Sequence, residues 1–196
     1  MSIRKARFWR RIYLIFSLAL GVTSPFVCWY LIPEFNPIIK PLSYFGVSEL
    51  TAWYWNASLI VISFALYLNA KKSIPNYFGA SSGKQILDFL LIISFLGLII
   101  TAIFPMDKTL IHRISATCFF LSYNLFIFYF GVLRSKKYIR KGMFSMIIGC
   151  CMLLSSLLLL PFPSYGVFEI VYFLFALLWN GKLFYKRIRT ETTINP

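Results

Sequence analysis

The sequence has little charge for its length, and acidic residues are especially rare. Charged residues make up 13% of the 196 positions, whereas a soluble domain carries about 25%. Six acidic residues stand against 20 basic ones, and 59% of the chain is hydrophobic. This composition argues against a soluble globular domain.

Histidine and cysteine are also scarce. His112 is the only histidine, so the chain cannot build a multi-histidine metal site. The cysteines lie in apolar sequence without CxxC spacing, at Cys28, Cys118, Cys150 and Cys151. We therefore expect no disulfide framework, no metal and no cofactor. The HExxH and P-loop motifs of metalloproteases and nucleotide hydrolases are absent as well.

Long apolar sequence is what the chain has in abundance. It comes in six runs of about 20 residues, the length with which a helix crosses about 30 Å of hydrocarbon. A helix is expected because every backbone amide in lipid must find its acceptor within the segment, whereas barrel strands are shorter and alternate in polarity. The predicted fold is all-α, a single membrane domain of six transmembrane helices at about residues 12–32, 50–70, 85–104, 111–133, 143–162 and 166–185.

The basic residues cluster at alternate ends of these runs. All but three of the 20 fall at the N-terminus, in the loops after the second and fourth runs, and at the C-terminal end; the exceptions are Lys40, Lys108 and Arg113. The positive-inside rule therefore predicts a protein of the cell membrane with both termini in the cytoplasm. The same distribution favours contact with anionic membrane lipids over binding of nucleic acid.

Polar groups gather in the predicted hairpin between the third and fourth runs. The stretch FPMDKTLIHRISA, residues 104–116, contains Asp107, His112 and Arg113. Asp107 is placed to cap the next helix, where negative charge is favourable. At 100° per residue, His112 shares one helix face with Ser115 and Ser122. Ionisable groups at the edge of a membrane bundle are candidates for function.

These residues belong to a wider set of polar groups expected at the outer ends of the helices. We predict that this set binds a lipid headgroup or a small polar ligand, with Lys40 and Arg113 on a phosphate and His112 donating a hydrogen bond. The predicted ligand-binding residues are Asn36, Lys40, Ser43, Glu49, Asn56, Asp107, His112, Arg113 and Glu169.

Two other functions fit the same residues. An intramembrane enzyme acting on a lipid or lipid-linked substrate would use His112 as general base, oriented by Asp107 or Glu49. The third function is that of a small-solute transporter or channel, although no inverted repeat or pair of broken helices indicates it. We prefer a non-enzymatic binding protein because the sequence pairs no nucleophile or oxyanion donor with the histidine.

Two groups of short motifs resemble a known family. They are PEFNP at 33–37, Ser43, Gly46, Trp55 and Asn56 in the first group, and FP at 104–105, Asp107, His112 and Ala116 in the second. Together they resemble the prokaryotic membrane family of domain of unknown function 998 (DUF998) over nearly the whole chain. The resemblance implies a six-helix integral membrane protein and no established activity. A more distant likeness is to Frag1/DRAM/Sfk1-type proteins, which are linked to lipid organisation.

Overall fold

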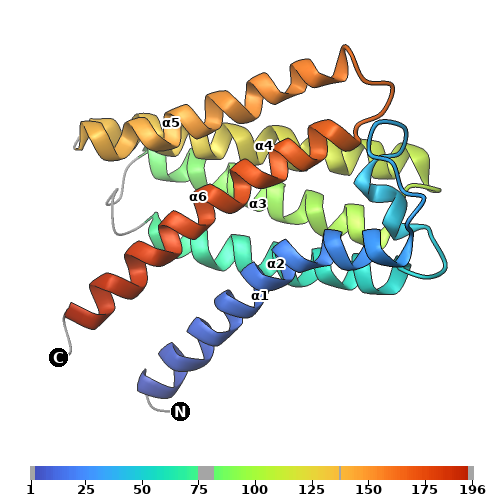
Figure 1. Ribbon diagram of the computed structural model, residues 1–196. Helices are drawn as coiled ribbons and strands as arrows, with labels where there is room; N and C mark the ends of the chain where they lie inside the picture. Colours follow the sequence, from blue (N-terminus) through green and yellow to red (C-terminus); the bar gives the residue numbers. More distant parts are fainter. Residues whose placement is uncertain (1–2, 75–81, 137, 194–196) are drawn as a thin grey trace.

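The computed structural model describes residues 3–74, 82–136 and 138–193, and over these ranges it contains helices and no strand. Figure 1 shows the long helices lying beside one another, with both termini at the same end of the bundle. The all-helical prediction is confirmed. In chain order the elements are α1 (Ile3–Leu31), η1 (Leu42–Gly46), α2 (Ala52–Ser73), α3 (Ser82–Ile103), α4 (Thr109–Ser135), α5 (Ile139–Leu154), η2 (Ser155–Leu159) and α6 (Gly166–Thr193), where η marks a 3-10 helix.

Five of the described helical segments are long and apolar enough to cross a membrane. They are Arg11–Leu31, Gly83–Ile103, Thr109–Ser135, Ile139–Leu159 and Gly166–Tyr185. The second predicted run forms α2, which has 22 residues. Its tryptophan, tyrosine and asparagine residues make it less apolar than the other five.

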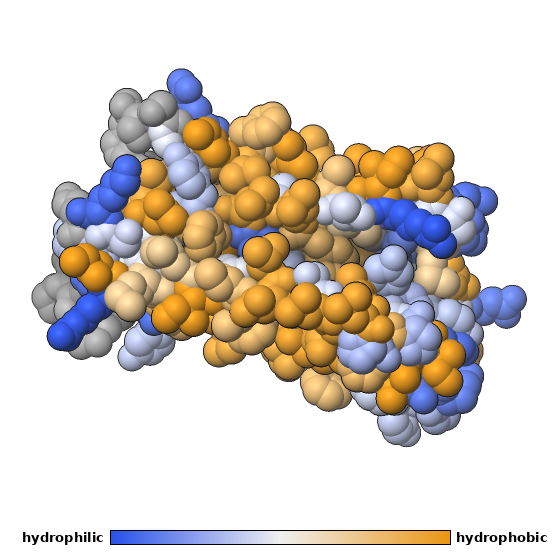
Figure 2. Space-filling model, turned by 90° about the horizontal axis from the view of Figure 1, so that it is seen from above, coloured by the Kyte–Doolittle hydropathy of each residue, from blue (hydrophilic) through white to orange (hydrophobic). Residues whose placement is uncertain are grey.

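The surface of the bundle suits contact with lipid. Large apolar side chains are exposed on each of the six long helices, among them Phe16, Phe64, Phe89, Leu121 and Leu178. In Figure 2, hydrophobic side chains cover the middle of the face, and hydrophilic ones gather toward its two ends. Soluble monomers expose contiguous apolar patches of only a few hundred Å², so this surface indicates a protein that lies in a membrane.

Some helices extend beyond the apolar runs that predicted them. α1 begins at Ile3, within the basic N-terminal segment, and α6 continues to Thr193. The apolar run marks where lipid contact ends, and the helix need not end there. Lys and Arg are good helix formers, so the charged ends continue the helix outside the hydrocarbon.

Glycines allow α3, α4 and α5 to pack closely. A Cβ atom at Gly97 of α3 would lie 2.9 Å from the carbonyl oxygen of Ser115 and 2.9 Å from the amide nitrogen of Phe119, both in α4. Gly131 of α4 and Gly142 of α5 allow a similar approach between the next pair of helices. Helices in lipid associate through such contacts, because burial of apolar surface provides little drive there.

Aromatic rings join α6 to α4. The ring of Trp179 stands nearly perpendicular to the rings of Phe126 and Phe130, with centroids 5.8 and 5.6 Å away. The hydroxyl of Tyr172 donates a hydrogen bond to the backbone carbonyl of Phe120 at 2.7 Å. These contacts fix the height of α6 against α4, and thereby position the residues of the first turn of α6.

Candidate ligand-binding cavity

The chain between α1 and α2 folds over one end of the bundle as a cap segment (residues 32–51). Phe35 and Phe45 are 3% and 0% exposed. The rings of Phe45 and Trp55, the latter in α2, meet edge-on with 5.3 Å between their centroids. η1 forms part of this segment. The cap is therefore packed into the protein by its own aromatic side chains.

Long-range hydrogen bonds hold the cap segment in place. The carboxylate of Glu169, in the first turn of α6, accepts the backbone N–H of Leu42 at 2.5 Å and also that of Ser43. These are the first amides of η1, which have no acceptor within the helix itself. On the other side, the side chain of Asn56 donates to the carbonyl of Gly46 at 3.0 Å. The cap is thus tied to both α6 and α2.

His112 is buried at the start of α4, with 8% of its surface exposed. Its Nδ1 lies 2.9 Å from the carbonyl oxygen of Phe104, at the end of α3. A carbonyl only accepts, so Nδ1 carries a proton in this hydrogen bond, and Nε2 is a free basic nitrogen whenever the ring is neutral. Within the described ranges, the hydrogen-bond partner of the ring is this carbonyl and not a carboxylate.

Hydroxyl groups continue the polar contact between α3 and α4. The side-chain oxygens of Thr101 and Ser115 lie 2.9 Å apart, and both residues are buried. Ser122 is buried too, so the helix face predicted from His112, Ser115 and Ser122 does point into the protein. Arg113, one position from the histidine, is exposed.

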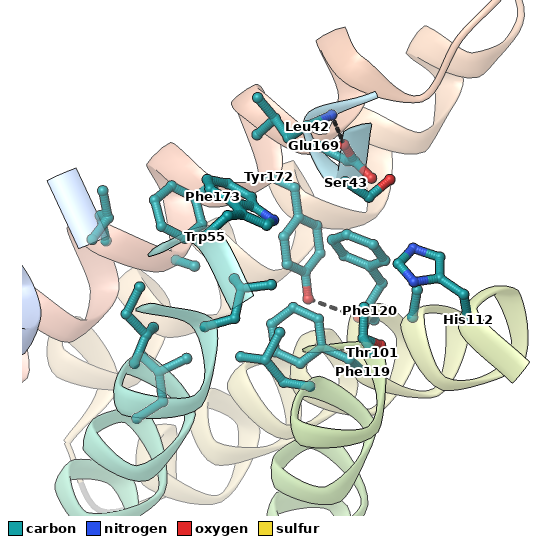
Figure 3. Close-up of a pocket in the computed structure, with 17 residues that line it drawn as sticks. Leu42, Ser43, Trp55, Thr101, His112, Phe119, Phe120, Glu169, Tyr172 and Phe173 are labelled. Atoms are coloured by element: carbon teal, nitrogen blue, oxygen red, sulfur yellow. Dashed lines mark hydrogen bonds between the residues drawn. The ribbon is translucent and has the colours of Figure 1, made fainter. Parts of the chain in front are cut away.

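A cavity of about 90 Å³ lies beneath the cap, with walls from α2, α3, α4, α6 and η1. Most of its wall is apolar and includes Leu59, Phe119 and Leu177. In Figure 3, Ser43 and Glu169 lie together near η1, and His112 projects from α4 beside Phe120. The polar residues of the lining are Ser43, Thr101, His112, Glu169 and Tyr172. The cavity surface is therefore almost wholly apolar, with a few polar atoms near the cap (Figure 3).

Three of the nine predicted ligand-binding residues line this cavity, namely Ser43, His112 and Glu169. They come from three different elements, η1, α4 and α6. The fold brings them together because the cap segment lies against the start of α6. Glu169 reaches the cavity while its carboxylate is hydrogen-bonded to backbone amides of η1.

Two predicted residues make hydrogen bonds with the backbone. Asn36 accepts the N–H of Ile38 at 2.9 Å, which closes a local turn in the cap. Asn56 makes the bond to Gly46 already described. Neither belongs to the cavity lining. Their contacts shape the cap rather than the cavity.

The remaining four predicted residues also lie outside the lining. The ammonium group of Lys40 lies 4.0 Å from the ring centre of a cap tyrosine. Glu49 and Arg113 are exposed. Asp107 pairs with Lys108 at 3.4 Å, and Lys108 occupies the N-cap position of α4. The prediction that Asp107 caps this helix is therefore wrong, because the turn places it one residue too early.

Several cavity residues were not predicted from the sequence, including Thr101, Phe119, Phe120 and Tyr172. A threonine within an apolar run was the available signal for Thr101. The aromatic residues carried no signal, because a ring in a membrane helix has the same sequence appearance whether it faces lipid, core or cavity.

In the described part of the chain, no three side chains of His, Cys, Asp or Glu lie close enough to hold a metal ion together. Its cysteines are free thiols.

Fold and surface define an all-helical protein whose helices are suited to membrane spans. A family model described as "Protein of unknown function (DUF998)" matches residues 15–183. The chain belongs to this family, which confirms the resemblance seen in its motifs. No curated protein and no solved structure matches the chain.

Proposed function

We propose that all six long helices cross the cell membrane and that both termini lie in the cytoplasm. Five segments have the required length and composition, and α2 lies alongside them with 22 residues. Both termini lie at one end of the bundle (Figure 1), as an even number of crossings demands. The basic residues are concentrated at that end, which supports a cytoplasmic location.

We further propose that the protein binds an amphipathic membrane molecule in the cavity beneath the cap. The observation that carries this proposal is the lining itself, an apolar wall along α2 and α6 with Ser43 and His112 near the cap. An alkyl chain suits the wall, because its burial leaves no polar group without a partner. A hydroxyl or phosphate at its end suits the few polar groups near the cap.

The size of the cavity limits how much of a ligand can enter it. A cavity of about 150 Å³ lined by apolar side chains binds benzene, and this cavity measures about 90 Å³. It therefore has room for the end segment of an alkyl chain or a few atoms of a headgroup. The rest of a lipid would lie outside, where Lys40 and the exposed Arg113 are available to a phosphate.

His112 supplies the polar recognition. Its Nδ1 is fixed on the carbonyl of Phe104, so the ring orientation is set before a ligand arrives. Nε2 then accepts a hydrogen bond from a ligand hydroxyl when the ring is neutral, or donates one to a phosphate when the ring is charged. A preorganised group of this kind binds without the entropy cost of ordering a free side chain.

Native mass spectrometry of the full chain in detergent tests the proposal. The wild-type protein is expected to retain an amphiphile that organic solvent extracts. Ala116→Trp, which fills the cavity from α4, should remove it. Thr117→Trp adds the same ring at the exposed neighbouring position and should leave it bound. Retention by Ala116→Trp at the wild-type level would overturn the proposed site.

A second variant tests the role of the histidine. His112→Phe keeps the ring volume and removes the hydrogen bond, which at about 1 kcal/mol corresponds to a fivefold weaker affinity. Ile114→Phe adds the same ring at an exposed position of α4 outside the cavity lining, and it is the control. If both variants retain the amphiphile equally well, the ligand does not reach His112.

The geometry supports binding more than catalysis. A general base that abstracts protons efficiently is commonly oriented by a carboxylate. In the described structure, His112 is oriented by a backbone carbonyl instead, and Asp107 pairs with Lys108. We therefore prefer ligand binding to the enzyme hypothesis, in which His112 is the base and Asp107 or Glu49 orients it.

A further inference from the structure

A second, smaller cavity of about 30 Å³ lies deeper in the bundle, between α1, α2 and α6. Three polar side chains line it, one from each helix, and they are Ser17, Asn69 and Asn180. Each is at least nine-tenths buried, with 3%, 3% and 2% of its surface exposed. Polar side chains inside a membrane bundle are costly, and they hydrogen-bond to neighbouring helices or face a water-filled cavity.

The polar groups of this inner cavity are held by hydrogen bonds to one another and to neighbouring residues. The amide nitrogen of Asn180 donates to the hydroxyl of Tyr123 at 2.6 Å and to the carbonyl of Ala176 at 2.8 Å. The amide nitrogen of Asn69 lies 3.4 Å from the side-chain oxygen of Asn180. All the polar groups of the lining are uncharged. They offer hydrogen bonds and no counter-charge.

The two cavities lie one behind the other along α2 and α6. Ile62 and Leu66 of α2 and Leu177 of α6 belong to the linings of both. These three side chains therefore separate the cavities, and we call them the apolar plug. From Trp55 to Asn69, α2 rises about 21 Å, which is two thirds of the roughly 30 Å of hydrocarbon.

Packed residues lie at both ends of this row of cavities. At one end, η1 lies over the first cavity and is held by Glu169. At the other, Leu14 of α1, Ala65 of α2 and Phe184 of α6 form a small buried cluster, and all three line the inner cavity. The structure thus shows two chambers in a row along α2 and α6, with the apolar plug between them.

We propose that these chambers, when no amphiphile occupies the first of them, form a gated passage for small neutral hydrogen-bonding solutes, with the apolar plug as its gate. An apolar constriction blocks such a path by excluding water, and it opens when the side chains move apart. The uncharged lining of the inner chamber selects against ions, which would lose their hydration there without compensation. The inner chamber measures about 30 Å³, and about 10–15 Å³ of such space holds one water, so the solutes are water itself and molecules of a few atoms.

Proteoliposomes of the full chain test this proposal, with water and urea as probes in stopped-flow light scattering. Leu66→Ala removes part of the plug, and urea entry is expected to rise severalfold over that of the wild type. Leu68→Ala is the matched control, because Leu68 lies two positions away on α2 and is exposed. It should leave entry at the wild-type rate.

A second variant tests the polar chamber. Asn180→Leu keeps a similar volume and removes the hydrogen-bonding group, so in the Leu66→Ala background it should return urea entry toward the wild-type rate. Circular dichroism and thermal melting in detergent identify any variant that fails to fold. If the double variant Leu66→Ala/Asn180→Leu takes up urea as fast as Leu66→Ala alone, the path does not run through the inner chamber, and the proposal is overturned. Entry at the rate of protein-free vesicles in Leu66→Ala, or an equal rise in Leu68→Ala, would overturn the gate.

Discussion

The carboxylate of Glu169 accepts the backbone N–H of Leu42 at 2.5 Å, a hydrogen bond between residues 127 positions apart. It joins the first turn of α6 to the first residue of η1. The bond therefore closes the cap over the cavity, and it connects the stability of the cap to the position of the last helix.

Removing this carboxylate should loosen the cap. We expect Glu169→Ala to destabilise the protein by about 1.5–3 kcal/mol, the range for hydrogen bonds to charged groups. Glu169→Gln retains an acceptor and should cost less. Thermal unfolding in detergent measures the difference, with the exposed Glu49→Gln as control. A melting temperature of Glu169→Ala equal to that of the control would contradict the assigned role.

Replacement of glycine by alanine should affect stability differently at Gly97 and at Gly181. Gly97→Ala forces a methyl group against the backbone of α4, and overpacking of this kind costs about 1–3 kcal/mol. A Cβ atom at Gly181 meets nothing within 4 Å. Gly181→Ala should therefore be neutral or stabilise by up to about 1 kcal/mol, because alanine favours the helix. Thermal unfolding of both variants in detergent measures the two effects. Equal shifts of the melting temperature in one direction would refute the close approach of α3 to α4.

The hydroxyls of Thr101 and Ser115 should be energetically coupled. Hydrogen bonds between membrane helices contribute about 0.6 kcal/mol on average in double-mutant cycles. A cycle of Thr101→Val and Ser115→Ala is expected to give a value of this order. The matched cycle of Thr101→Val with Ser122→Ala should be additive, since Ser122 lies about 10 Å further along α4. Equal coupling in the two cycles would show that the measured value does not come from the direct contact.

Labelling of single cysteines, introduced into a chain whose four native cysteines are replaced by alanine, tests the proposed topology. A membrane-impermeant maleimide should label Glu49→Cys on intact cells, because this position lies in the cap segment. It should label Lys136→Cys, in the basic loop after α4, only after the membrane is permeabilised. Both positions are exposed in the structure. The reverse pattern would invert the orientation, and labelling of both on intact cells would contradict the six-span arrangement.

Hydropathy predicted the existence of the helices well, because in lipid every apolar run must satisfy its backbone hydrogen bonds within its own helix. The ends of the helices were less accessible to prediction. α6 continues eight residues past the expected end at 185, to Thr193, because helix propensity persists where hydropathy falls. The position of Pro105 correctly indicated a break between α3 and α4, which end and begin at Ile103 and Thr109.

The site was harder to predict than the helices. The face of α4 that carries His112 follows from the 100° rotation per residue, and its burial confirms that step. The partner of Glu169 does not follow from any periodicity, because it depends on how the irregular cap segment folds back. For the same reason, the sequence could not separate Ser43, which lines the cavity, from Lys40 and Asn36 in the same loop.

The position of the single histidine has a practical consequence. His112 lines the cavity, and no other imidazole exists in the chain. Histidine labelled selectively with nitrogen-15 would thus give one pair of ring signals, free of assignment ambiguity. One of these belongs to the nitrogen on the Phe104 carbonyl and serves as an internal reference. The other reports occupancy of the cavity in an intact lipid bilayer.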